Sequence, residues 1–471
     1  MPPVMFASNS YQSRSLPLSA QQLKNAFAEA EHPDAKSQMP LFGAPGLTEF
    51  AVCGAGPVRG VYNLNGVAYA VSGQNLYRVA SGVATLLGTG ILGNQVVSMS
   101  DNGDQLCIVN GAQGYIYTVS TNTLVQITDP NFYPADLVTY FDTYFVFNKK
   151  GTNIFFVSNP NDGLTYDGLL FASAEAQSDV CIGCIENLEL LFIFGQKHIE
   201  MWYDAGTVDF PFQRYAGGVI PYGCVSPHSI VKQDGAIFFL GSDGMFYRLQ
   251  GNVAIRISTH PIENLVADLP DVALCQALTY TLQGHKMVAF TFPQSGHTVV
   301  WDISTNRWHE RESWNADSIS YGRWRGNCAV QMPNQQILVG DQYSGTIAVM
   351  DWSTYTELGN TIQMVATSVP FHSDKKRVFV SRLEFDFEQG VGTTTGQGQN
   401  PVVMLEMSKD GGRTWIPLQP RRSLGPIGQY ATRQKFTRLG QSMNGYVFRA
   451  IITDPVKRVM IQAHADISVG L

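Results

Sequence analysis

Short apolar segments alternate with polar, glycine-rich turns through the middle of the chain, from about residue 58 to residue 352. Each unit is an apolar strand-like segment, a polar turn and a second strand that carries an aromatic side chain. Clear examples are residues 67–71 followed by 76–79, and residues 236–240 followed by 245–249. Short alternating segments bounded by glycine are typical of antiparallel strands.

Seven such units follow one another, about 40 to 54 residues apart. Repeats of this length with paired strands are typical of β-propeller blades, because one blade cannot bury both of its faces and stacks on its neighbours around an axis. We predict an all-β protein with a propeller over residues 57–358, of six or seven blades, with seven favoured. An ordinary series of hairpins in another all-β fold is the alternative. The aromatic residues expected at equivalent blade positions are Tyr77, Tyr117, Phe156, Trp202, Tyr247 and Trp301.

The residues before the repeats have a different pattern. Ser19 and Gln22 resemble a capping box ahead of an apolar segment, which predicts a short helix from about residue 20 to 31. Proline and polar residues surround it. We therefore expect residues 1–56 to form an extended arm that contains this helix and that lies along the body or reaches a neighbour.

The residues after the repeats also form a separate region. Alternating segments at 377–387, 402–407, 446–452 and 459–464 predict strands, and the glycine- and threonine-rich residues 390–399 predict a loop. We predict a β-sandwich-like C-terminal domain over residues 359–471.

Composition excludes several classes of protein. Hydrophobic residues make up 44% of the 471 residues, and charged residues only 15% against about 25% in an average soluble domain. The scarcity of charge is consistent with surface that partners cover. No apolar segment approaches the roughly 18 residues that a membrane span needs, and the first residues lack the basic region of a secretory signal. We expect no membrane partner.

The seven cysteines are sparse and mostly lie in apolar strand-like segments. Cys181 and Cys184 form the one CxxC pair, and a zinc ribbon requires a second pair. We expect reduced core cysteines in a protein made in a cytosol, with no metal and no cofactor.

Charge is unevenly distributed. Residues 371–471 contain 14 Lys/Arg and 8 Asp/Glu, whereas residues 1–370 contain 17 Lys/Arg and 30 Asp/Glu. The basic end is the candidate interface, through contact with an acidic protein or with DNA phosphates. Solvated strand edges that resist aggregation explain the same residues equally well. The candidate interface residues are Lys375, Lys376, Arg377, Arg421, Arg422, Arg433, Lys435 and Arg438.

Catalytic motifs are not evident in the sequence. Residues 408–415 fit S-x-D-x-G-x-T-W and resemble the Asp box of sialidase-like propellers, which stabilises a hairpin turn rather than performing catalysis. No G-x-S-x-G, P-loop, H-E-x-x-H or EF-hand pattern is present. His228, His309 and Glu310 fit no specific chemistry. We predict no enzymatic activity and no catalytic residue.

Several short segments, taken in order, resemble the packaged-DNA-stabilisation protein of short-tailed phages. The basic β-rich end is also similar, and the resemblance covers nearly the whole chain. The segments that carry it are Pro45 to Phe50, residues 58–61, residues 67–79, Ile199-Glu200 with Trp202-Tyr203 and Gly206, and residues 299–302.

The resemblance implies a structural role in the virion tail, after assembly in the host cytoplasm. In that family a ring, usually of six copies, attaches beneath the portal and its adaptor (head-completion) protein. The ring extends the DNA channel, helps to retain the packaged DNA without reading its sequence, and docks a tail needle or plug and tailspikes or fibres. The family supplies no catalytic residues.

Two other classes remain open. One is a carbohydrate-binding or glycoside-hydrolysing propeller, including a phage receptor-binding protein, which predicts a glycan-binding cleft. The other is a propeller scaffold for cellular protein complexes, which predicts no association with portal components.

Overall fold

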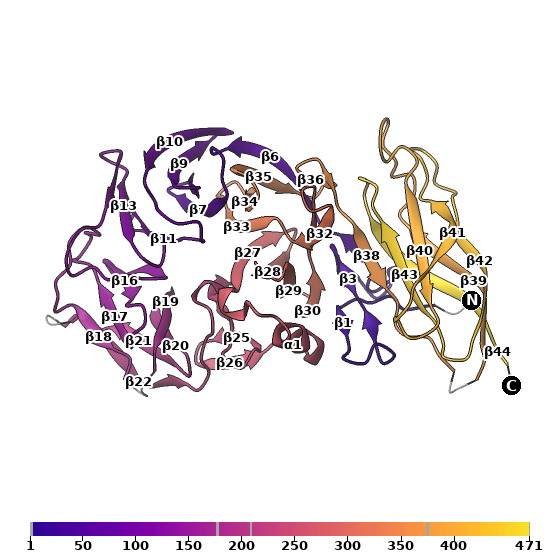
Figure 1. Cartoon of the computed structure of the whole chain (residues 1–471), viewed down its shortest axis with the longest axis horizontal. Helices are drawn as coiled ribbons and strands as arrows, with labels where there is room; N and C mark the ends of the chain where they lie inside the picture. Colours follow the sequence, from indigo (N-terminus) through magenta and orange to yellow (C-terminus); the bar gives the residue numbers. More distant parts are fainter. Residues whose placement is uncertain (1–2, 176–178, 208–209, 374–375, 471) are drawn as a thin grey trace.

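Seven four-stranded antiparallel sheets, five of them separate and two forming parts of larger sheets, surround a common axis, and a β-sandwich lies beside them (Figure 1). This count refers to residues 3–175, 179–207, 210–373 and 376–470, which are the residues that this computed structural model describes. The seven sheets are the blades of a propeller.

The chain enters each blade at the strand nearest the axis. Blade one consists of β7 (Val58–Leu64), β8 (Val67–Ser72), β9 (Asn75–Ala80) and β10 (Val83–Thr89). Blade two consists of β11 (Ser98–Asp101), β12 (Gln105–Val109), β13 (Gly114–Thr118) and β14 (Thr123–Gln126). Blade three consists of β15 (Val138–Phe141), β16 (Tyr144–Asn148), β17 (Ile154–Val157) and β18 (Phe171–Ser173). Blade four consists of β19 (Cys181–Asn187), β20 (Leu190–Gly195), β21 (Ile199–Asp204) and β22 (Phe212–Ile220). Blade five consists of β23 (Val231–Gln233), β24 (Ala236–Leu240), β25 (Phe246–Gln250) and β26 (Val253–Arg256). Blade six consists of β27 (Gln276–Leu282), β28 (His285–Phe292), β29 (His297–Asp302) and β30 (Arg307–Glu310).

An N-terminal strand completes the seventh blade. The blade consists of β33 (Gly326–Gln331), β34 (Ile337–Asp341), β35 (Thr346–Asp351) and β6 (Gly46–Val52). Strand β6 pairs antiparallel with β35, with Leu47 opposite Met350. Residues 46–52, which we expected in the arm, are therefore part of the propeller, and they close the ring of blades by joining its two ends.

The six aromatic residues do occupy equivalent positions, as predicted. Each lies on the third strand of its blade, and each packs into the apolar layer between its own blade and the preceding one. Trp202, for example, packs with Phe155 of the preceding blade, at 4.9 Å between ring centroids. The recurring aromatic side chain thus fills the same inter-blade layer around the propeller.

Two sheets form the sandwich around one apolar core. One sheet contains β4 (Ala26–Ala28), β5 (Leu41–Gly43), β44 (Val459–Val469), β39 (Val378–Phe387) and β42 (Gln434–Ser442). The other contains β3 (Leu23–Lys24), β38 (Met364–Thr367), β43 (Val447–Ile452), β40 (Val402–Ser408) and β41 (Ile416–Ser423). Strands from both ends of the chain therefore build this domain.

The helix expected at about residues 20–31 is wrong. Those residues form β2 (Ala20–Gln21), β3 and β4 instead. In β3, Lys24 pairs with Glu310 of β30 on one side and with Val365 of β38 on the other. Partners far away in the sequence satisfy the backbone groups that a helix would have paired locally, so tertiary pairing overrides the local signal.

Strand β3 consequently joins blade six and one sandwich sheet into a single nine-stranded sheet (Figure 1). The remaining elements are short. They are β1 (Tyr11–Gln12), β31 (Glu312–Asn315), β32 (Ser320–Arg323), β36 (Thr356–Glu357), β37 (Asn360–Thr361), the 3-10 helices η1 (Pro227–Ser229) and η2 (Val272–Leu274), and helix α1 (His260–Ala267). Among the described residues, no helix has the length and hydrophobicity to span a membrane.

Candidate functional site

A cavity of about 410 Å³ lies on the propeller axis and is lined by the innermost strands of all seven blades. This volume is in the range of small-molecule sites. A DNA duplex, whose major groove alone is about 12 Å wide, does not fit along such an axis. The axis can hold a small group but cannot be a passage for DNA.

A second cavity, of about 550 Å³, forms the mouth of the axis. The two cavities share Val96, His228, Gln276 and Asn327 in their linings. We call the second cavity the axial mouth. Six amide side chains line it: Asn94, Gln95, Gln276, Gln294, Asn327 and Gln342. Its charged lining residues are Asp136, Lys150 and Arg323. The mouth is therefore rich in neutral hydrogen-bonding groups.

Arg59 fixes one wall of the mouth. It is 1% exposed, and its guanidinium donates to the carbonyl oxygens of Gln95, Gly73, Ile91 and Leu92 at 2.6–2.9 Å. Burial lowers its pKa. Because three of these bonds hold the loop that contains Gln95 and the fourth holds the turn at Gly73, Arg59 has a structural role at this site.

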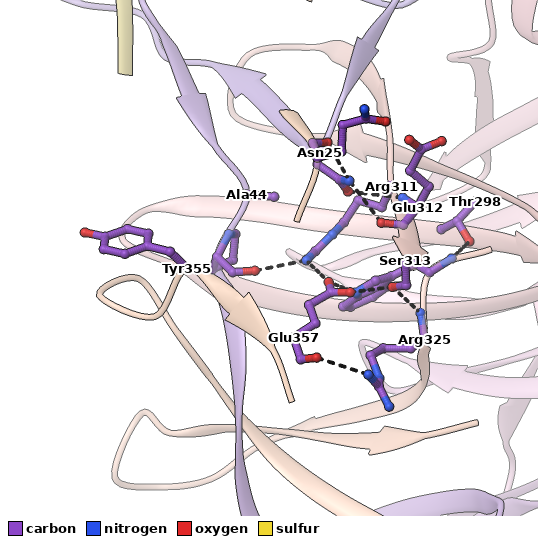
Figure 2. A network of polar contacts seen from close by, with 12 residues as sticks. Asn25, Ala44, Thr298, Arg311, Glu312, Ser313, Arg325, Tyr355 and Glu357 are labelled. Atoms are coloured by element: carbon purple, nitrogen blue, oxygen red, sulfur yellow. Dashed lines mark hydrogen bonds and ion pairs between the residues drawn. The ribbon is translucent and has the colours of Figure 1, made fainter. Parts of the chain in front are cut away.

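A second polar site lies where the propeller meets the sandwich, and its centre is Glu357 (Figure 2). Glu357 is 2% exposed and lies on β36 in the connection between the two domains. Its Oε1 accepts from Arg311 Nη2 and from Trp324 Nε1, each at 3.0 Å, and its Oε2 accepts from the Ser313 hydroxyl. The Arg311 guanidinium also lies 4.1 Å from the centroid of the Trp324 ring.

Two more arginines extend this junction. Arg325 donates to the Glu357 carbonyl oxygen at 3.1 Å and binds both carboxylate oxygens of Asp341 at 3.0 Å. Arg458 of the sandwich, whose pKa burial lowers to about 10, donates to the carbonyl oxygens of Ala44 and Tyr355. The arm, the connection and both domains thus meet in one buried polar network, which fixes their relative orientation.

Asn25 connects the arm to the same junction (Figure 2). It is fully buried with a φ of 49°. Its Nδ2 donates to the carbonyl oxygens of Glu312 and Gln363, and its Oδ1 accepts from Glu312 N at 3.1 Å. One side chain therefore bonds the arm to β31 and to the segment that enters the sandwich.

Sequence reasoning did not identify the residues of this junction. The available signal was the dense charge at residues 309–312 and the paired arginines at 323 and 325, inside segments that otherwise alternate like strands. The acidic residue that each arginine contacts could not be predicted, because the partners come from distant elements.

The structure separates the predicted basic residues into smaller groups. Arg421 and Arg422 on β41 lie close to β42, where the Arg422 guanidinium lies 5.4 Å from the Phe436 ring and Gln434 Nε2 donates to Ser423 O. Arg433 and Lys435 are on this same edge of the sandwich, and Arg433 forms an ion pair with Glu384.

The other predicted basic residues lie elsewhere. Lys376 and Arg377 precede β39 at the end where Val378 pairs with Ser442, and Arg438 lies between the two groups on β42 with a φ of 62°. All of the described basic candidates are exposed except Arg422, which is half-buried. Lys375 lies outside the described residues.

The Asp-box-like turn has the expected turn geometry. Asp410 accepts from the backbone of Arg413 and Thr414 and from the Ser408 and Thr414 hydroxyls, and these bonds hold its pKa below the usual range. Gly411 contacts Pro17 of the arm closely. The turn therefore anchors the arm and contains no second carboxylate with which to perform hydrolysis.

The described cysteines are free, and burial raises the pKa of the Cys184 thiol to about 12. Cys181 and Cys184 are both fully enclosed in the core between blades three and four. A search of the described residues finds no cluster of three His, Cys, Asp or Glu side chains suited to holding a metal ion.

Two family models match the chain. One, described as the β-propeller of bacteriophage P22 Gp10, covers residues 4–355, and the other, described as its β-sandwich, covers residues 363–468. No curated protein sequence matches significantly.

Several solved structures are similar to this chain at low identity. The WD40 propeller domain of Doa1 has a TM-score of 0.41 at 11% identity and covers 65% of this chain and 97% of its own. YCF48 from Cyanidioschyzon merolae has a TM-score of 0.41 at 11% identity, and the match covers 65% of this chain and 98% of YCF48. The extracellular domain of BT4673 from B. thetaiotaomicron has a TM-score of 0.44 at 10% identity, and the match covers 88% of this chain and 59% of that domain.

Proposed function

We propose, from the premise that the chain belongs to the bacteriophage P22 Gp10 family, that it is a non-enzymatic structural protein of a phage tail. Copies of the chain, six in the family that the sequence resembles, form a ring below the portal and its adaptor. The ring extends the DNA channel, retains the packaged genome, and docks a needle or plug and tailspikes or fibres. The protein assembles in the host cytoplasm and becomes part of the virion tail.

The observation that carries this proposal is the family match along both domains in order. It covers residues 4–355 and 363–468 of a 471-residue chain. Because function resides in surfaces and sites rather than in a propeller as such, the agreement of both domains supports the proposal more strongly than the propeller alone.

The closed propeller axis constrains how a DNA channel can form. Inner strands of all seven blades surround a cavity of only about 410 Å³. In the proposed ring, DNA therefore passes between copies of the chain and not through any single propeller. The buried junction around Glu357 supports this arrangement, since each copy keeps a fixed angle between its two domains.

The test is electron microscopy of the purified chain, alone and mixed with a portal–adaptor complex. We expect a ring of density below the adaptor that is absent without the chain. Failure of the wild-type chain to bind any portal–adaptor complex from a short-tailed phage would contradict the proposal.

The basic candidates are tested by charge reversal. We expect Lys376, Arg421 and Arg422 changed to Glu to weaken docking at low salt, with a smaller effect at high salt, since exposed charges steer encounter and are screened. The matched control changes Arg78, Lys197 and Arg214, three exposed cations of the propeller, to Glu. Equal docking of both variants at every salt concentration would show that the basic end makes no electrostatic contribution.

A further inference from the structure

Arg323 in the axial mouth is a buried cation without an anionic partner. It is 6% exposed, and its Nη2 donates to Asn327 Oδ1 at 2.7 Å. Among the described residues, no carboxylate lies within ion-pair distance of it. Two carboxylates oppose the lowering of its pKa from a longer distance. Asp341 binds Arg325, and Asp271 accepts hydrogen bonds from Gln294 and Ser295.

An unpaired buried charge is unfavourable, since desolvation costs several kcal/mol unless an opposite charge or hydrogen bonds offset it. Arg323 Nη1 has no hydrogen-bond partner among the described residues, and Arg323 is part of the lining of the mouth. Gln276, which lines both axial cavities, likewise has a buried Oε1 without a partner. The Nε and Nη2 of Arg323 are bonded to Trp324 O and Asn327 Oδ1, so its Nη1 is the donor left for a ligand, and the unpaired acceptor of Gln276 lines the same cavity.

The other charges of the mouth balance one another. Lys150 Nζ forms an ion pair with Asp136 Oδ1 at 2.7 Å. Burial lowers the pKa of His228 to about 4, so its ring is neutral near pH 7. The remaining polar groups of the lining are neutral amides. The mouth thus presents one positive charge that no carboxylate of the described residues contacts directly, among many hydrogen-bonding groups.

We propose that the axial mouth is a binding site for a carboxylate group, with Arg323 as its principal ligand. The free edge of the guanidinium donates to the carboxylate oxygens, which is the geometry that guanidinium groups favour. One carboxylate balances one cation, whereas a doubly charged phosphate does not. Gln276 Oε1 accepts from a donor elsewhere on the same ligand.

The carboxylate can come from a small free molecule or from a protein, such as a chain terminus or an acidic side chain of a docked partner. Both sources share the contact with Arg323. They differ in what surrounds the carboxylate, because a peptide also offers backbone groups to the six amides of the mouth.

The test uses the full chain labelled with ¹⁵N-arginine, with the Arg323 side-chain signal assigned by its loss in Arg323→Lys. Sodium acetate is added at constant ionic strength against sodium chloride. We expect a saturable shift of the Arg323 signal and a much smaller shift of Arg59, whose donors are already bonded to carbonyl oxygens. No saturable shift of Arg323 at any acetate concentration would overturn the proposal.

Acetyl-trialanine with a free terminal carboxylate, and its amidated form as control, distinguish the two sources. Binding about tenfold tighter than acetate supports a protein carboxylate, and binding equal to or weaker than acetate supports a small free one. Equal binding of the free and amidated peptides would contradict carboxylate recognition.

Variants in calorimetric titrations provide the second measurement. We expect Arg323→Lys to weaken acetate binding by about tenfold. We expect Gln276→Glu, which adds a negative charge to the mouth and leaves Arg323 in place, to abolish it. Arg214→Gln, a change of an exposed propeller arginine, is the matched control. Unchanged binding in Gln276→Glu would overturn the assignment to this cavity.

Discussion

At the residue scale, stability is concentrated in side chains that fill the layers between blades. Trp202 is one of the six recurring aromatic residues. Its Nε1 donates a buried hydrogen bond to Glu200 Oε2 at 3.1 Å. It is 8% exposed and packs against Phe155. Such side chains occupy one position in each repeat, so the same substitution can be compared across blades.

We expect Trp202→Ala to lower the free energy of unfolding by roughly 3–5 kcal/mol, because it leaves a cavity and removes one buried hydrogen bond. Denaturant unfolding measures this change. Tyr215→Ala, which truncates a half-exposed aromatic residue of the same blade, is the control and should cost far less. A similar loss of stability in both variants would contradict the interpretation that the recurring aromatic residue stabilises the layer between adjacent blades.

Titration of a buried histidine is a second residue-scale property. His309 is 2% exposed, and burial lowers its pKa to about 3, against the opposing effect of the Asp302 carboxylate. Above the unfolded-state pKa of about 6.5 the ring is neutral in both states, and the histidine adds no pH dependence. Below that pH the unfolded state binds the proton and the folded state does not, so stability falls as the pH falls.

We therefore expect His309 to decrease stability by up to about 1.4 kcal/mol per pH unit between pH 6.5 and pH 4. Unfolding measured from pH 8 to pH 4 should show a shallower decline in His309→Gln than in the wild type. His32→Gln, a change of an exposed histidine, should leave the slope unchanged. If stability fell with pH at the same rate in all three proteins, the pH dependence would not come from His309.

At the element scale, strand β3 is the feature that unites the two domains, since it pairs with β30 on one side and with β38 on the other. Two residues of strand are too few to hold this position by backbone pairing alone. Asn25 directly follows β3 and adds three side-chain hydrogen bonds and a left-handed backbone conformation.

Two substitutions at Asn25 separate these contributions. Asn25→Gly removes the three hydrogen bonds but tolerates the positive φ, whereas Asn25→Ala also strains the backbone. We expect both to be destabilising, with Ala costing about 1–2 kcal/mol more than Gly. Thermal unfolding provides the comparison, and a glycine variant less stable than the alanine variant would show that backbone conformation is not a factor.

At the scale of the whole molecule, a buried polar network centred on Glu357 lies where the propeller meets the sandwich, and Arg458 of the sandwich extends it. Glu357 accepts from Arg311, Trp324 and Ser313, which lie in and directly beside the β31–β32 hairpin that connects blade six to blade seven. Its own strand, β36, pairs with β6 at Leu47. Removing the charge leaves Arg311 buried without an anion.

We expect Glu357→Gln to cost about 3–5 kcal/mol, the range for breaking a buried ion pair, and to separate the unfolding of the two domains. Calorimetry should resolve the sandwich and the propeller as two transitions in the variant and should show closer transitions in the wild type. Glu49→Gln, on an exposed residue of the adjacent strand β6, is the control. Equal spacing of the transitions in both variants would refute the coupling.

The sequence by itself determined the local architecture. Alternating apolar segments, glycine turns and the recurring aromatic residue predicted the blades and the inter-blade layer, because these signals depend on residues a few positions apart. The basic C-terminal end was equally visible as composition. Its division into smaller groups was not, since the pairing of β41, β39 and β42 sets where each cation lies.

Only the tertiary structure decided what joins distant residues. The helix signal at Ser19 and Gln22 failed because β3 found partners at Glu310 and Val365, and residues 46–52 became the last strand of a blade whose other strands begin at residue 326. The contacts of Glu357 and the isolation of Arg323 arise in the same way. Local patterning specifies which residues are apolar, but only the folded chain specifies which buried charge meets a partner and which does not.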